Sequence, residues 1–184
     1  MAKWTFDQAH TQANFSARHM MVSTVRGSFR KVDGVLDFDP DNPAAASVEA
    51  VIDVASMDST GVEQRDQHLL SPDFLDVEKY PTITFKSTRV EPNNDNTKAK
   101  VYGDLTIKDV TREVVLDVEF HGEGITPYGQ NIVGFEASTK IDREDFGLTW
   151  NVALETGGWL VGKDIKISID AEFIKVTEEE AQEA

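Results

Sequence analysis

Apolar and polar residues alternate along most of the chain, and the alternation has a period of two residues. In segment 47–56, for example, Val48, Ala50 and Ile52 fall on one face and acidic residues fall on the other. Successive side chains of a β-strand point to opposite faces, so this pattern predicts half-buried antiparallel strands. The same pattern occurs in segments 81–88, 101–109, 114–122, 131–142 and 164–173, and further candidate strands lie at 9–20, 28–34 and 35–40.

The connections between these segments are short and carry turn-forming residues. Gly, Pro, Asn or Asp occurs in each of KVDG, DPDNPAA, EPNNDNTKAK, KDVT and TPYGQN. Eight or more short, evenly spaced strands predict an all-β fold, either a barrel or a sandwich. No linker or internal repeat divides the chain, so we expect one domain over residues 1–176, followed by an acidic tail over residues 177–184.

One segment, near residues 60–77, interrupts the strand pattern. Thr60 and Glu63 have the spacing of a capping box, with Ser59 or Asp58 as the alternative cap. Pro72 could occupy the first position of a second helical segment. We therefore expect two short helical segments here. Their apolar side chains must be buried, and on a barrel the available place is one open end: Leu69, Leu70, Phe74 and Leu75.

Three stretches occur in an order that resembles the YceI-like family: VIDVASMDSTG at 51–61, RDQHLLSPDFLDVEKYP at 65–81 and GDLTIKDVTREV at 103–114. The resemblance extends from about Trp4 to Val176. Members of that family resemble lipocalins in architecture and are described as polyisoprenoid-binding. The resemblance therefore implies a single antiparallel lipocalin-like β-barrel with a short helical insert. It also implies a long-chain isoprenoid ligand, such as a polyprenyl phosphate or an isoprenoid quinone.

The apolar face of a barrel of about eight strands either packs against itself or surrounds a small ligand. As candidate ligand contacts we select positions on the apolar faces: Phe15, Ile52, Phe85, Leu105, Val118, Phe135, Ile167 and Ile169. Ordinary core packing is the alternative for each position. A slip of one residue in register would also exchange the two faces.

The polar end of such a ligand needs partners near the insert. Arg65 could form paired hydrogen bonds to a phosphate or bind a carbonyl, His68 could donate to the same group, and Asp66 could orient either side chain. The alternative is an ion pair or cap that fixes the insert to the barrel. His19 and His10 flank the first strand pattern and are further candidates for the cavity wall, with a structural role as the alternative.

Composition and charge narrow the classes of partner. The net charge is −15 and no basic stripe is interleaved with aromatic residues, so we expect no nucleic-acid partner. The chain has no cysteine, and its histidines show no metal-ligand spacing, so we expect no metal and no cofactor apart from the lipid ligand. We find neither a signal-peptide pattern nor an apolar run of roughly 18 residues, so we expect a cytoplasmic protein without stable membrane insertion. An exported mature form is the alternative.

Together with these observations, the family resemblance implies a protein that carries or stores an isoprenoid lipid. A structural or stress-related assembly module without a ligand is the first alternative, and the family resemblance favours a homodimer. Enzymatic activity comes third, because neither a G-x-S-x-G motif nor a Gly-rich phosphate loop occurs.

Overall fold

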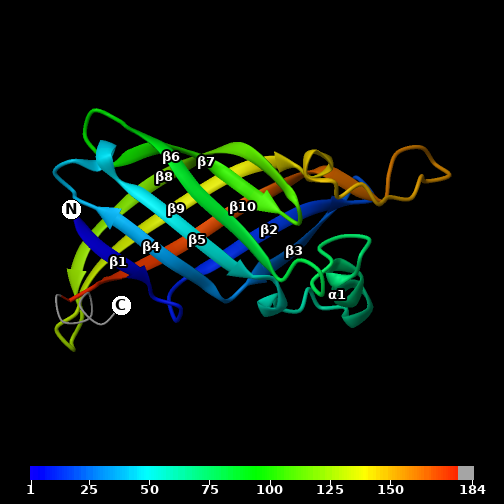
Figure 1. Ribbon diagram of the computed structural model, residues 1–184. Helices are drawn as coiled ribbons and strands as arrows, with labels where there is room; N and C mark the ends of the chain where they lie inside the picture. Colours follow the sequence, from blue (N-terminus) through cyan, green and yellow to red (C-terminus); the bar gives the residue numbers. More distant parts are fainter. Residues whose placement is uncertain (178–184) are drawn as a thin grey trace.

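The computed structural model describes residues 1–177, in which ten strands form one antiparallel sheet and one short α-helix lies at its end (Figure 1). The expected acidic tail lies, from residue 178 on, outside the described residues. The strands are β1 Ala2–Phe6, β2 Gln12–His19, β3 Ser23–Phe29, β4 Val32–Phe38, β5 Ser47–Asp53, β6 Thr82–Pro92, β7 Lys98–Ile107, β8 Val110–Ile125, β9 Asn131–Asp142 and β10 Val161–Lys175. The helices are α1 Glu63–Leu70 and the 3-10 helices η1 Pro43–Ala45, η2 Val54–Ser56 and η3 Arg143–Phe146.

The sheet closes into a barrel because β1 pairs with β4 on one side and with β10 on the other. Strands β1 and β2 pair with successive stretches of the same edge of β10, so they act as one strand that is interrupted at residues 7–11. Strands β3 and β4 continue each other in the same way across residues 30 and 31. Counted like this, the ten strands form a closed barrel of eight, which confirms the predicted fold class.

The predicted alternation of faces is present in the strand register. Phe85 lies opposite Leu105, Ile167 lies opposite Phe15, and all four side chains point into the barrel. The hairpin between β7 and β8 turns on two residues, and the first of them, Lys108, adopts the left-handed conformation that such tight turns require. The period-two pattern therefore predicted the faces of these strands correctly.

The buried apolar side chains form two clusters. One surrounds Trp4, Phe38 and Phe173 where β1 completes the ring. The other surrounds Val54, Phe74 and residues of η3 at the end that carries α1. Side chains of both clusters also line the barrel interior.

The insert differs in detail from the sequence prediction. Helix α1 begins at Glu63 with Val62 as its N-cap and no side-chain cap, so the predicted capping box at Thr60 is wrong. Residues 71–79 form hydrogen-bonded turns, so the second helical segment is wrong as well. Within residues 1–177, no helix combines the length and the apolar character that crossing a membrane demands.

Candidate functional site

The barrel encloses a cavity of about 660 Å³ whose walls are mostly apolar. This volume falls within the range of about 300–1,000 Å³ that small-molecule sites occupy. Every apolar residue that the sequence predicted as a ligand contact lines this cavity: Phe15, Ile52, Phe85, Leu105, Val118, Phe135, Ile167 and Ile169. The register therefore brings side chains from seven strands to one lumen.

The lumen is open rather than filled by its own side chains. Of the eight predicted contacts, only Leu105 is fully buried, and the other seven are half-buried although they point inward. In a packed core, large apolar side chains touch neighbours on all sides and lose nearly all of their accessible surface. The residual exposure of these seven side chains is therefore surface that faces the cavity.

Two glycines help to keep the lumen open. The ring of Phe15 lies against Gly27, its cross-strand neighbour on β3, in space that a Cβ atom at Gly27 would need. The ring of Phe85 lies in the same way against Gly103 on β7. Because each glycine gives its neighbour room, both rings lie against the wall instead of projecting into the lumen.

One end of the cavity is bordered by α1, by the 148–160 segment and by the turn between β2 and β3 (Figure 1). Arg65 lines the cavity at this end, but its guanidinium is already engaged. Nε donates to the Thr60 hydroxyl and Nη2 donates to the Thr60 carbonyl, both at 2.7 Å.

Asp66 fixes the start of the insert. Its carboxylate accepts hydrogen bonds from the Ser59 hydroxyl at 2.6 Å and from the Thr60 backbone N–H at 2.8 Å. Hydrogen bonds from Ser59 and Thr60 hold the pKa of Asp66 below its usual range. The polar contacts of Arg65 and Asp66 thus pin the insert, as in the structural alternative for this pair.

His68 lies between a carboxylate and two aromatic rings. Its Nε2 lies 2.8 Å from Asp73 Oδ2. Its ring contacts the rings of Trp150 and Phe74 edge-on, with centroid distances of 4.4 and 5.0 Å. No sequence pattern indicated Trp150, which follows η3 outside the strands and reaches the cavity only through the tertiary fold.

His19 ends β2 and also lines the cavity. Within the described chain, no hydrogen bond or ion pair engages its ring, and the ring is half-buried. The ring nitrogens of His19 are therefore available to form a hydrogen bond with a ligand at this end of the cavity.

Arg143 is a further residue that the sequence did not indicate. It is almost completely buried, with 3% of its surface exposed, and its donors bond the carbonyls of Gly162, Leu148, Trp150 and Val161. Burial lowers the pKa of its guanidinium. Arg143 thus ties both ends of the 148–161 segment to the barrel and fixes the position of Trp150.

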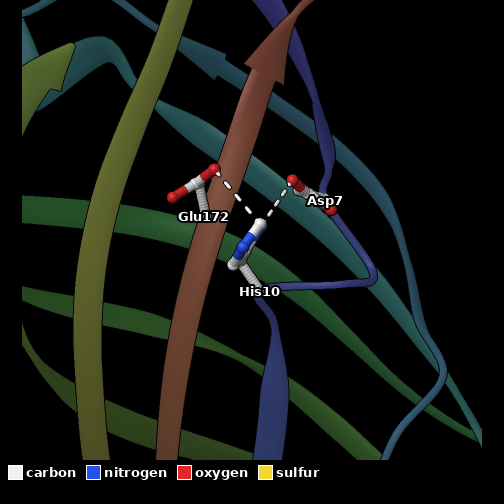
Figure 2. Close-up of side chains that lie close together, drawn as sticks. All are labelled: Asp7, His10 and Glu172. Carbon is white, nitrogen blue, oxygen red and sulfur yellow. Dashed lines mark hydrogen bonds and ion pairs between the residues drawn. The ribbon is translucent and has the colours of Figure 1, made fainter. Parts of the chain in front are cut away.

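His10 does not line the cavity, so its candidate role in the wall is wrong. The interruption between β1 and β2 places it on the outside, where its Nδ1 lies 2.9 Å from Asp7 Oδ2 and 3.7 Å from Glu172 Oε1 (Figure 2). The hydrogen bond with Asp7 raises the pKa of His10 and lowers that of Asp7. These donor atoms lie within 4.8 Å of one another, close enough for a metal ion to bridge them, but their mutual ion pairing already explains the arrangement.

Known proteins resemble this chain in sequence or in fold. A UPF0312 protein of Staphylococcus epidermidis is 41% identical over 174 residues, which span 94% of this chain and 98% of that protein. The crystal structure of Burkholderia cenocepacia BcnA superposes with a TM-score of 0.76 at 26% identity, covering 91% of this chain and 98% of BcnA. A polyisoprenoid binding domain from Saccharophagus degradans, implicated in plant cell wall breakdown, shares the fold with a TM-score of 0.65 at 12% identity, covering 96% of this chain and all of that domain, 100%. The profile of the YceI-like domain matches residues 4–173, and the chain belongs to the YceI-like family.

Proposed function

We propose that this protein binds a long-chain isoprenoid lipid in the barrel and carries or stores it. The observation that carries the proposal is the open, apolar lumen, in which seven inward-pointing side chains keep accessible surface. Support also comes from the Saccharophagus degradans domain, which has the same fold and is called a polyisoprenoid binding domain.

The free energy of transfer suits a carrier. Burial of each methylene group stabilises a bound chain by about 0.8 kcal/mol relative to water. A bilayer interior offers nearly the same transfer free energy, so exchange between protein and membrane is close to balanced. A lipid in this lumen would therefore be lost slowly to water and exchanged readily with a membrane.

The polar end of the lipid would lie at the α1 end of the cavity. His19 has a free imidazole there, and the Nη1 donors of Arg65 make no hydrogen bond within residues 1–177. His68 lines the same end, although Asp73 engages one of its ring nitrogens. Cationic and N–H donor groups suit both a phosphate and a quinone carbonyl.

The direct experiment is organic extraction of the purified protein, followed by mass spectrometry of the released lipid. Lipid-free protein is then offered a polyprenyl phosphate, an isoprenoid quinone and the corresponding head-group-free hydrocarbon. We expect uptake of an isoprenoid, and His19→Ala should weaken binding of a headed lipid more than binding of the hydrocarbon. No extracted lipid and no uptake of any of these probes would reject the proposal and favour a ligand-free structural role.

Substitution of a wall residue tests the location of the chain. Ala50 lines the lumen, whereas Val51, its neighbour on β5, points outward and is 40% exposed. Ala50→Phe should shorten the longest isoprenoid accepted and should leave short ones bound, while Val51→Phe should change neither. Overpacking at Ala50 can cost roughly 1–3 kcal/mol, so urea unfolding must accompany the binding assay. If both folded variants bind the same range of isoprenoid chain lengths, the ligand does not occupy the lumen beside Ala50.

A further inference from the structure

Exposed apolar side chains gather at the end of the barrel that carries α1. Met20, Met21 and Val22 form the turn between β2 and β3 and are 45%, 65% and 80% exposed. Val152 and Trp159, in the neighbouring 151–160 loop, are 46% and 53% exposed. We call these five residues the apolar rim. Isolated exposed apolar residues are ordinary, but a contiguous group marks an interaction surface.

Contacts between the turn and the loop make the rim one surface. The Met20 N–H donates to the Leu160 carbonyl at 2.8 Å, and the Met21 side chain lies against Gly158. Within the loop, the Leu160 N–H donates to the Val152 carbonyl at 2.9 Å. Figure 1 shows the turn and the loop projecting at the same end of the barrel.

The rim also borders the cavity. His19 and Leu160 both line the lumen, and each adjoins a rim residue in the chain. A surface that contacted the rim would therefore meet the end of the cavity at which we place the polar head of the lipid.

The β2–β3 hairpin, which ends in three of the rim residues, has a net charge opposite to that of the whole protein. The chain has 33 acidic residues, yet none occurs between Gln8 and Val32, where four Lys or Arg residues lie. Arg18 and Arg26 are exposed on the outer face of the β2–β3 hairpin, and Lys166 of β10 lies in the same row, since both Arg26 and Lys166 pair with Ser16. We call Arg18, Arg26 and Lys166 the basic strip. Within residues 1–177, no carboxylate forms an ion pair with any of them, and the only acid in the 151–160 loop is Glu155.

We propose that the apolar rim and the basic strip dock on the surface of an anionic phospholipid bilayer, with the α1 end of the cavity facing the lipid. This inference rests on the proposed lipid-carrying function. Apolar and aromatic side chains at loop tips enter the headgroup region, while Lys and Arg contact anionic headgroups. The remaining acidic surface is repelled by the same bilayer and so orients the protein.

A second copy of this chain is a less suitable occupant of this surface. A symmetric contact uses the same patch on both subunits, so it would bring the unpaired arginines of one strip towards those of the other. An anionic headgroup layer supplies the opposite charge. The charge of the strip therefore favours the bilayer.

The test is co-sedimentation of lipid-free protein with phosphatidylcholine vesicles that contain phosphatidylglycerol, compared with phosphatidylcholine alone. We expect binding to the anionic vesicles, weakening as salt rises, and a blue shift of tryptophan emission that Trp159→Phe removes. The double variants Met21→Asp/Val22→Asp and Arg18→Gln/Arg26→Gln should each weaken binding by about tenfold or more.

Matched controls separate this surface from general effects. Ile125 and Tyr128 are 73% and 90% exposed in the β8–β9 turn, and Ile125→Asp/Tyr128→Asp should leave vesicle binding within about twofold. Lys3→Gln/Lys175→Gln removes the same amount of charge as Arg18→Gln/Arg26→Gln and should also leave vesicle binding unchanged. Thermal unfolding confirms that each variant is folded.

Three outcomes would overturn the inference. These are no binding to anionic vesicles, equal loss in the rim variants and their controls, or a dimer that the rim variants convert to a monomer without any vesicle binding. If the protein takes up an isoprenoid but ignores vesicles, docking is wrong and the proposed function stands. If it binds anionic vesicles but takes up no isoprenoid, the proposed function is wrong.

Discussion

At the scale of single residues, Gly27 determines where the ring of Phe15 lies. A Cβ atom at Gly27 would overlap only the far end of this ring, which can rotate away from the wall. The backbone of Gly27 does not have a positive φ, so alanine is tolerated there conformationally. The effect of a substitution at Gly27 should therefore fall on the lumen rather than on the fold.

We expect Gly27→Ala to push the Phe15 ring into the cavity and to reduce the length or bulk of the isoprenoid accepted. Gly124→Ala is the control, because a Cβ atom there meets only Ile132 at an ordinary distance of 3.4 Å. Binding assays with prenols of increasing chain length measure the longest isoprenoid that each variant accepts. Identical length limits in the two folded variants would show that Phe15 does not bound the ligand.

The Asp7–His10 pair makes stability depend on pH. The pKa of His10 is raised in the folded protein, so its contribution is present below the unfolded value of about 6.5 and disappears as pH rises through the folded value. The pKa of Asp7 is lowered, so its contribution is present above about pH 4 and disappears as pH falls through the folded value. The pair is therefore fully formed between about pH 4 and 6.5.

His10→Gln should lower the melting temperature slightly within this pH window and not above about pH 9. The effect should be small, because the His10 side chain is 65% exposed. The double variant Asp7→Asn/His10→Gln should lose little more than the single variant does, since the two residues are coupled. A pH-independent loss would mean that His10 acts through packing.

At the scale of elements, the strands and their faces could be predicted because apolar and polar residues must alternate along a half-buried strand. Each predicted wall residue from Phe15 to Ile169 lines the lumen for that reason. Whether the lumen was open could not be predicted, since alternation is the same in a packed and a hollow barrel. The positions of Trp150 and Arg143 depend on contacts between distant segments, which leave no local pattern in the sequence.

The insert shows why the local sequence pattern predicted the wrong helix cap. Thr60 has the spacing of a cap, but its hydroxyl and backbone N–H bond the Asp66 carboxylate, one turn into the helix. The helix therefore begins at Glu63, behind an uncapped Val62. The contacts of Asp66, together with those of Arg65, replace a capping box as the device that holds the insert.

Asp66→Ala should loosen the insert without unfolding the barrel. The variant removes the acceptor for Ser59 and Thr60, and we expect faster limited proteolysis within residues 59–80 and faster release of bound lipid. Glu63→Ala is the control, because within residues 1–177 the Glu63 side chain accepts only from Gln67 on the helix surface. Equal proteolysis of both variants would show that Asp66 does not hold this segment.

At the scale of the whole molecule, charge is distributed unevenly around the barrel. The net charge of −15 led us to expect no nucleic-acid partner. The acid-free β2–β3 hairpin shows that a total charge does not describe one face. Pairing of the hairpin with β10 joins its arginines to Lys166, which is distant in sequence.

The strands of the barrel are also not equally hydrogen-bonded to their neighbours. Strand β4 has hydrogen-bonded neighbours on both sides, β1 and β5. Within the described residues, β3 pairs with β2 alone, apart from contacts of its last residues with segment 56–58. Half of the amide groups along the first part of β3 therefore face no strand.

Amide hydrogen exchange should reveal this asymmetry. Strands β3 and β4 follow each other in the chain. In residues 23–27, the amides on the edge of β3 that does not pair with β2 should nevertheless take up deuterium well before the amides of β4. The barrel would then open first as a seam beside β3, while the ring completed by β1 stays shut. Exchange as slow in β3 as in β4 would mean that another strand, from a second molecule, covers that edge in solution.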